Sequence, residues 1–309
     1  MPDERRPNII WIMADDLSWG DLGCFGSEKI LTPSIDRLAA EGIRFHACYA
    51  GSTVCAPSRS SLMQGLHQGH ATVRGNAAPG GYRHNLQPED VTVAQVLQSA
   101  GYRCGLFGKW GLAVEDQTGQ PNEKGFDEFR GYLNQRHAHN YYPPYLFRDT
   151  EHIEFPQHAG HDHTAPNEYD AQGRITPNGM ADPDAARYSF DVYAEAAEEF
   201  VHAHHAEPMF LYLAYTIPHQ AFEVPSLEPY TDRDWPLLQT IYAAMVTRMD
   251  TAVGRLLGLL EDCGIADDTL IFFTSDNGYS HRGVGEEPSL DEFFGHHGPF
   301  KGEKGNLHQ

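Results

Sequence analysis

Three nearly continuous apolar runs constrain the fold of this chain more than any other feature. They are NIIWIMADD at 8–16, MFLYLAY at 209–215 and TLIFFTSDNG at 269–278. Runs of this kind are typical of strands that are buried on both faces of a parallel sheet, because helices cover both sides. We therefore expect these segments, together with YRCGLFG at 102–108, to be strands of one largely parallel sheet.

The segments between these runs carry helical patterns. Ser34 is placed to cap a helix that Gly42 would end, and the longer patterns put apolar side chains on one helical face. IRFHACYA at 43–50 predicts a further strand. Strands that alternate with helices predict an α/β fold with a mostly parallel central sheet sandwiched by helices. The expected helices cover 34–42, 92–101, 184–205 and 235–263.

Residues 134–183 differ from the rest because they are rich in His, Pro, Asn and Gly and show little periodicity. We expect a long loop insertion within a single domain spanning 1–309, and insertions of this kind often cover a site. HAGHDH at 158–163 resembles a metal cluster. Histidines in irregular polar loops are usually solvated, and we favour that interpretation.

The charge of the chain limits its partners. There are 22 basic and 43 acidic residues and a net charge of −21, which argues against a nucleic-acid partner. An anionic substrate would need its own local positive charge. No apolar run approaches the roughly 20 residues that span a bilayer, so we expect no membrane partner.

The N-terminus and the cysteines bear on localisation. MPDERRPNII has no apolar core of a signal peptide, and five scattered cysteines do not form a disulfide framework. We expect a cytoplasmic protein, or an exported one if a leader has been removed.

Two of the expected strands end in oxygen-bearing side chains, Asp15-Asp16 and Asp276-Asn277. Because ligands of open α/β sheets gather beyond the carboxyl ends of the strands, these two pairs are expected to converge. Hard oxygen donors suit Ca²⁺ or Mg²⁺. Each pair alone is also compatible with simple turn chemistry, but the two together favour a metal site.

The stretch STVCAPSRSSL at 52–62 contains the most informative cysteine. Pro57 favours the first position of a helix, so Cys55 is expected just before a helix N-terminus, where free N–H groups attract anions. The Arg59 guanidinium suits an oxyanion such as phosphate or sulfate. The other four cysteines are interpreted as packing residues.

CAPSR followed by SSLMQGL matches the signature Cys-x-Pro-Ser-Arg, and the chain resembles the type I sulfatases of the alkaline phosphatase superfamily. The similarity covers essentially the whole chain, with 134–183 as its weakest part. The matching segments are PNIIWIMADDLSWGDLGCFG, TPSIDRLAAEGIRF, GYRCGLFGKWG, IPHQAFEVP, FFTSDNG and FKGEKGNL.

The resemblance implies hydrolysis of an aryl or carbohydrate sulfate ester. Cys55 would be converted by a formylglycine-generating enzyme to formylglycine, whose hydrate attacks sulfur and expels the alcohol. Its second hydroxyl then allows sulfate to leave. A hard cation beside the nucleophilic oxygen would lower the pKa of that oxygen.

The resemblance also assigns individual roles. Arg59 would hold the nucleophile, Lys109 and Lys304 would bind sulfate, and His219 would protonate the leaving oxygen. Lys301 is close enough in sequence to exchange with Lys304. The implied calcium ligands are Asp15, Asp16, Asp276, Asn277 and residue 55.

Two departures from the family stand out. GKWGL has Gly111 where many sulfatases have a histidine that assists sulfate release, and we expect His139, rather than His137, to take over that role. The chain also ends where sulfatases continue, so we expect the C-terminal antiparallel subdomain to be lacking.

Alternative functions remain at this point. A phosphate or phosphonate ester hydrolase of the same superfamily would use a similar site. A non-catalytic sulfate-binding protein or an incomplete domain is favoured by Gly111, whereas Cys55 and Arg59 argue against it.

Overall fold

The computed structural model describes residues 6–76, 85–158, 187–280, 289–296 and 298–306. Expectations for other residues lie outside this part of the chain. The strands are β1 (Asn8–Ala14), β2 (Arg103–Lys109), β3 (Glu128–Tyr132), β4 (Tyr145–Arg148), β5 (Glu151–Glu154), β6 (Met209–Ala214) and β7 (Thr269–Ser275). The α-helices are α1 (Pro33–Glu41), α2 (Cys55–Gln64), α3 (Val93–Ser99), α4 (Ser189–His204), α5 (Leu237–Asp262) and α6 (Leu290–Phe294).

The strands form one seven-stranded sheet in the order β5-β4-β3-β2-β6-β1-β7. The neighbouring pairs β3-β2, β2-β6, β6-β1 and β1-β7 are parallel, whereas β4 and β5 add an antiparallel edge next to β3. The prediction of a mostly parallel α/β sheet is therefore confirmed. The three apolar runs become the adjacent strands β6, β1 and β7. Burial explains the apolar side chains of β6 and β1, but the expectation of burial on both faces was wrong for β7, an edge strand in which Leu270 and Phe272 are 51% and 40% exposed.

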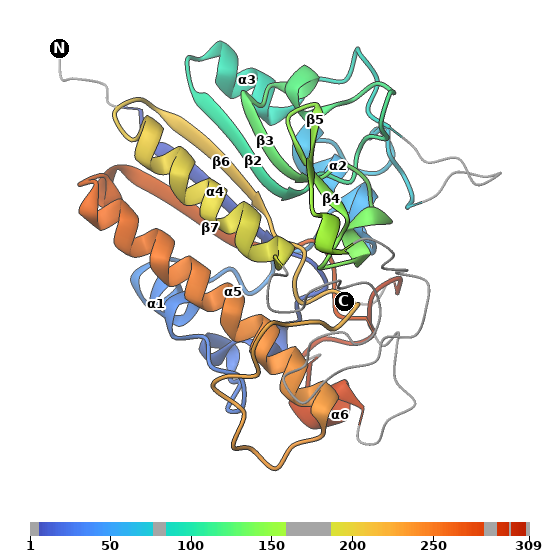
Figure 1. The fold of residues 1–309 in the computed structure, drawn as a ribbon, viewed down its shortest axis with the longest axis vertical. Helices are drawn as coiled ribbons and strands as arrows, with labels where there is room; N and C mark the ends of the chain where they lie inside the picture. Colours follow the sequence, from blue (N-terminus) through green and yellow to red (C-terminus); the bar gives the residue numbers. More distant parts are fainter. Residues whose placement is uncertain (1–5, 77–84, 159–186, 281–288, 297, 307–309) are drawn as a thin grey trace.

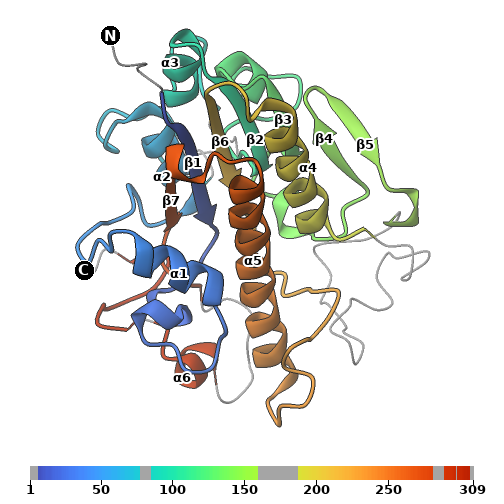
Figure 2. The ribbon, with the colours of Figure 1, turned by 90° about the vertical axis from the view of Figure 1, so that its left-hand side faces the viewer.

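Helices cover both faces of the sheet. Figure 1 and Figure 2 show α4 and α5 on one face, with α2 and α3 on the other. Alternate side chains of β1 enter different cores: Ile10 and Ile12 pack with the apolar stripes of α4 and α5. Met13 packs with Ala56 of α2 on the other face. The period of two along a strand produces this division.

Several local expectations were wrong. Residues 43–50 form no strand, and Ile43 and Phe45 are 82% and 66% exposed. Alternation alone does not make a strand without a neighbour to pair with, and no strand in the described ranges pairs with this segment.

The start of the first helix and the predicted insertion also differ from expectation. Helix α1 starts at Pro33 after Thr32, and Ser34 instead donates its backbone N–H to Asp250 Oδ2 at 3.1 Å. The predicted loop at 134–183 contains β4 and β5, which extend the sheet. These strands are only four residues long, too short for a clear periodic signal.

Among the described residues, no helix combines the length and the apolar character needed to cross a lipid bilayer.

Candidate active site

The sheet register brings distant parts of the chain to one edge. Ala14 at the end of β1 lies opposite Ser275 of β7, and Met13 lies opposite Ala214 of β6. The residues that follow these strands therefore leave the sheet side by side, as expected for the carboxyl edge of a parallel sheet.

The two acidic pairs meet at this edge. The Asp16 backbone N–H donates to Asp276 Oδ1 at 3.3 Å, and Asn277 Nδ2 donates to Asp16 Oδ1 at 2.6 Å. All four side chains are buried: Asp15, Asp16, Asp276 and Asn277. Carboxylates rarely gather in a buried place unless cations compensate their charge.

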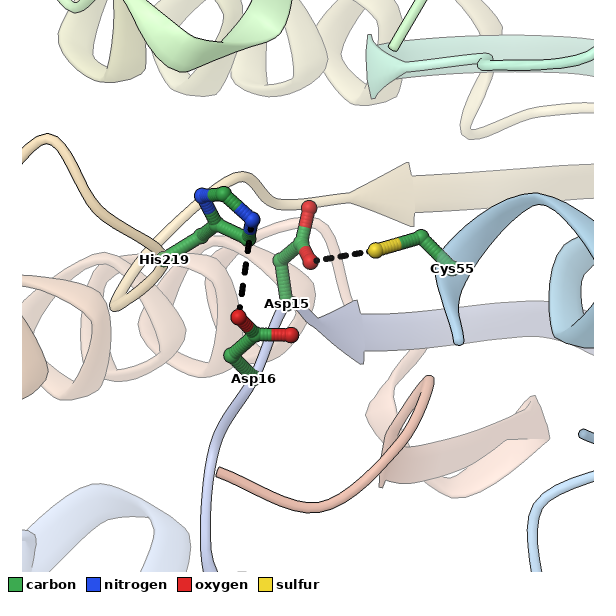
Figure 3. A group of neighbouring side chains, drawn as sticks. All are labelled: Asp15, Asp16, Cys55 and His219. Carbon is green, nitrogen blue, oxygen red and sulfur yellow. Dashed lines mark hydrogen bonds and ion pairs between the residues drawn. The ribbon is translucent and has the colours of Figure 1, made fainter. Parts of the chain in front are cut away.

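Helix α2 delivers Cys55 to the same place. The helix begins at Cys55, with Val54 as its N-cap and Pro57 as its third residue, so the expected start at Pro57 was wrong by two residues and Cys55 lies within the first turn. The Cys55 thiol donates to Asp15 Oδ1 at 3.4 Å, and Figure 3 shows its sulfur pointing toward that carboxylate. Burial and then the charge of Asp15 raise the pKa of this thiol well above its usual range, which favours the protonated thiol over the thiolate.

Buried basic side chains surround the acids. Arg59 donates from Nε and Nη2 to Asp276 Oδ2 at 3.1 and 2.9 Å and from Nη1 to the Lys109 carbonyl at 2.9 Å. Lys109 Nζ contacts Asp15 Oδ2 at 2.5 Å. Although burial alone would raise the pKa of Asp15, Lys109 and the other nearby cations hold it well below its ordinary value. Burial and Asp15 raise the pKa of Asp276 to about 6.

Lys304, rather than Lys301, reaches the centre. Its Nζ contacts Asp16 Oδ1 at 2.7 Å and donates to Cys55 Sγ at 3.2 Å, whereas Lys301 is exposed. Because Lys301 and Lys304 are only three residues apart, the sequence could not tell which of them reaches the site. The structure thus gathers Lys109, Lys304 and Arg59 into the local positive charge that the acidic chain requires.

Two imidazoles form one wall of the site. His219 Nε2 lies 3.5 Å from Asp16 Oδ2, and Figure 3 shows its ring beside that carboxylate. The His139 ring stacks on His219 with a centroid distance of 4.4 Å. Burial is the main reason why the pKa of His219 falls to about 3 and that of His139 to about 2, so both rings are neutral in this arrangement. His137 instead packs against Tyr132 and Tyr145.

Gln135 fills the space beside Gly111. Gly111 has φ +75°, and a Cβ added there would lie 2.2 Å from Gln135 Nε2. That amide nitrogen donates to the Gly111 carbonyl at 3.3 Å, and the Gln135 side chain is buried. Sequence reasoning identified Gly111 but missed Gln135, because the contact depends on β2 and β3 lying side by side.

The gathered residues fit a hard divalent cation. Asp15, Asp16, Cys55 and His219 each offer an atom within 4.8 Å of the others. Asn277 Oδ1 is buried and accepts no hydrogen bond within the described part of the chain, so an acceptor remains for a cation. A carboxylate and amide set suits Ca²⁺ or Mg²⁺. His219 belongs to this cluster although it was not predicted as a ligand.

HAGHDH gives no second cluster in the described residues. Only His158 of this segment is described, and its Nδ1 lies 2.8 Å from the Pro143 carbonyl while Nε2 accepts the Arg187 N–H at 3.1 Å. It is a buried packing histidine rather than a solvated one.

Comparison with known proteins identifies relatives in sequence and in fold. Residues 7–309 match the Sulfatase family model. The chain is 30% identical to an N-acetylgalactosamine-6-O-sulfatase of Bacteroides thetaiotaomicron, covering 89% of this chain and 60% of the relative. It is 32% identical to human arylsulfatase A, covering 89% and 52%. The chain thus spans only about half to three fifths of these relatives.

Solved structures show the same fold. The crystal structure of Ps i-CgsB superposes with a TM-score of 0.74 at 28% identity, covering 92% of this chain and 61% of the other. The phosphonate monoester hydrolase of Agrobacterium radiobacter has a TM-score of 0.61 at 22% identity, covering 92% and 66%, which shows shared fold alone. Because the family model matches residues 7–309, nearly the full length of the sequence, the chain belongs to the sulfatase family.

Proposed function

We propose that this chain is the catalytic part of a sulfatase that hydrolyses aryl or carbohydrate sulfate esters, using formylglycine made from Cys55 and a Ca²⁺ or Mg²⁺ ion. The observation that carries the proposal is the position of Cys55. It lies at the start of α2, within hydrogen-bond reach of Asp15 and Lys304 and next to the second acidic pair.

The proposed modification solves a chemical problem of this site. The buried thiol holds its proton tightly, so it is a poor nucleophile here. Formylglycine, produced by a formylglycine-generating enzyme, would supply an oxygen nucleophile at the same position. A divalent cation held by Asp15, Asp16, Asp276 and Asn277 would offset their charge and acidify that oxygen.

The chain's own cations have separate tasks. Arg59 is fully buried and fixed by Asp276 and the Lys109 carbonyl, so it orients the segment that carries residue 55. Lys109 and Lys304 present ammonium groups to the place where a sulfate would lie. Preoriented charges of this kind stabilise the charge that develops on sulfate oxygens without reorganising.

The two histidines move protons in the proposal. His219 protonates the leaving alcohol oxygen; an anionic sulfate ester beside it favours the imidazolium form, which raises its pKa toward that of a general acid. His139 assists the release of sulfate, in place of the histidine that many sulfatases have at the position of Gly111. The stacking of His139 on His219 supports this role, since it puts a second neutral imidazole at the site.

The relatives support a sulfate ester as the substrate. The Bacteroides relative is an N-acetylgalactosamine-6-O-sulfatase, and one structure of Ps i-CgsB, 27% identical with a TM-score of 0.76, is a complex with k-i-k-neocarrahexaose. A phosphate or phosphonate ester is the alternative, because the guanidinium and ammonium groups gathered at this site also suit a phosphoryl oxyanion.

The test is to produce the protein together with a formylglycine-generating enzyme. Mass spectrometry of the peptide containing Cys55 should show the aldehyde, and turnover of 4-nitrophenyl sulfate should exceed that of 4-nitrophenyl phosphate and phenylphosphonate esters. Cys55→Ala should abolish turnover, whereas Cys104→Ala, at a buried cysteine in β2, should retain it. A modified protein that prefers phosphonate, or an active Cys55→Ala variant, would contradict the proposal.

A further inference from the structure

The turn at 216–219 carries His219 and so determines where its ring lies. The His219 backbone N–H donates to the Thr216 carbonyl at 3.2 Å. The ring nitrogen Nδ1 contacts the Gln220 carbonyl, which is an acceptor, so Nδ1 holds a proton. Nε2 is left to face Asp16 Oδ2 at 3.5 Å, as Figure 3 shows. In the proposed function this is the nitrogen that protonates the leaving oxygen.

The Tyr141 hydroxyl lies against both ends of the same turn. Its oxygen is 2.7 Å from the Thr216 carbonyl oxygen and 2.6 Å from the His219 carbonyl oxygen, so its one proton is shared between them. Burial raises the pKa of Tyr141 well above its usual range, which keeps the hydroxyl a donor. A buried hydroxyl in this position ties the first residue of the turn to the last one.

Tyr141 is itself fixed by contacts on its other sides. Its backbone N–H donates to Glu223 Oε2 at 3.2 Å, and its carbonyl accepts the Ser189 N–H at the start of α4 at 2.9 Å. Its ring stacks on that of Tyr188 with a centroid distance of 5.5 Å, and the side chain is 0% exposed. The hydroxyl is therefore held in place by the fold and does not depend on the turn for its own position.

The segment that contains Tyr141 reaches His219 a second time. His139 precedes Tyr141 by two residues, and its ring stacks on the His219 ring with an angle of 21° between the planes. The segment thus contacts His219 at the ring, through His139, and at the backbone, through the tyrosine hydroxyl. Both contacts together define where the imidazole lies.

We propose that Tyr141 is a positioning residue for the sulfatase reaction, because its hydroxyl holds the turn that places His219 at the leaving oxygen. The inference rests on the proposed function and adds to it a residue that acts only through His219. Proton transfer depends steeply on the distance between donor and acceptor, so a small shift of the turn slows it. The effect should be largest for esters whose leaving oxygen has to be protonated.

The test compares phenyl sulfate with 4-nitrophenyl sulfate on formylglycine-bearing protein. Nitrophenolate leaves readily as an anion, whereas phenolate needs the proton from His219. Tyr141→Phe keeps the ring and its stack on Tyr188 but removes the hydroxyl. We expect kcat/KM to fall about tenfold more for phenyl sulfate than for 4-nitrophenyl sulfate. A smaller folded fraction would lower both values equally, so the ratio of the two reports on the position of His219 alone.

A double variant shows whether the tyrosine acts through the histidine. His219→Ala removes the acid and should change the ratio at least as much as Tyr141→Phe does. Adding Tyr141→Phe to His219→Ala should change the ratio no further, because nothing is left for the hydroxyl to position.

Two other tyrosines complete the comparison. The Tyr193 hydroxyl lies 2.7 Å from Thr216 Oγ1, so Tyr193→Phe loosens the same turn and should shift the ratio in the same direction. Tyr102→Phe is the matched control: its buried ring carries a hydroxyl that donates to the Pro7 carbonyl at 3.0 Å, outside the site, and the ratio should stay unchanged.

Equal losses on both substrates in Tyr141→Phe, no loss on either, or a further change of the ratio in the double variant would overturn the positioning role alone. Absence of turnover of any sulfate ester by the modified parent protein would overturn the proposed function, and this inference with it.

Discussion

Replacing Arg59 by methionine tests whether the basic residues hold the acidic site together. The methionine approximates the length of the arginine but removes two hydrogen bonds to Asp276 and one to the Lys109 carbonyl. Both Arg59 and Asp276 are 0% exposed. Breaking a fully buried ion pair leaves a charge without compensation, and such changes cost about 3–5 kcal/mol of unfolding free energy.

The assay is urea denaturation in the presence of a chelator, because a bound cation would compensate the unpaired carboxylate. Arg37→Met is the matched control, since Arg37 forms ion pairs with Glu41 and Glu261 while 45% exposed, and it should cost far less stability than Arg59→Met. In the double variant Arg59→Met/Asp276→Asn, part of the loss should be recovered, with a coupling energy of about 2 kcal/mol. An Arg59→Met variant as stable as Arg37→Met would refute the reasoning.

Three further predictions concern Glu223, His139 and Gly111. Glu223 is a buried residue outside the acidic cluster, and its Oε2 accepts the Tyr141 N–H at 3.2 Å. Burial raises the pKa of Glu223 to about 8 from its ordinary value of 4.5, so the stability that its neutral form contributes is complete below pH 4.5 and is lost as pH rises through 8. Glu223→Gln should therefore gain stability over the parent by several kcal/mol between pH 4.5 and 8.5, up to about 5, in denaturation series; parallel curves would contradict this. His139→Ala should lower kcat on 4-nitrophenyl sulfate by about tenfold to a hundredfold with a smaller change in KM, and unchanged steady-state turnover would remove its role. Gly111→Ala should cost about 1–3 kcal/mol because of its positive φ and the clash with Gln135; thermal unfolding of Gly111→Ala/Gln135→Ala should recover only the share due to the clash, and a neutral Gly111→Ala would disprove the argument.

The sequence predicted helices and strands best where a long apolar run or a clear apolar helical stripe ended abruptly. The runs that became β1 and β6 are largely buried strands, so their composition reports their position in the sheet, whereas β7 is an equally apolar edge strand that is only partly buried. The stripes of α4 and α5 likewise follow the faces that they bury. This approach failed for short elements. Strands β4 and β5 have only four residues each, and residues 43–50 alternate in polarity but have no partner strand in the described part of the chain.

The site could be foreseen in part for a similar reason. Asp15 and Asp276 follow strands, and parallel strands bring such positions together. Gln135 had no local signal, because its contact with Gly111 forms between the segments after β2 and β3, which approach one another only in the folded chain.

The central claim is that two distant acidic pairs enclose a single hard cation beside residue 55, and calorimetric titration of chelator-treated protein with Ca²⁺ tests it most directly. We predict one Ca²⁺ per chain, with binding strongly weakened in both Asp16→Asn and Asn277→Ala, one variant from each pair, and unchanged in Asp267→Asn, whose carboxylate is exposed and outside the site. Absence of Ca²⁺ and Mg²⁺ binding by the parent protein, or binding that survives both site variants, would contradict the claim.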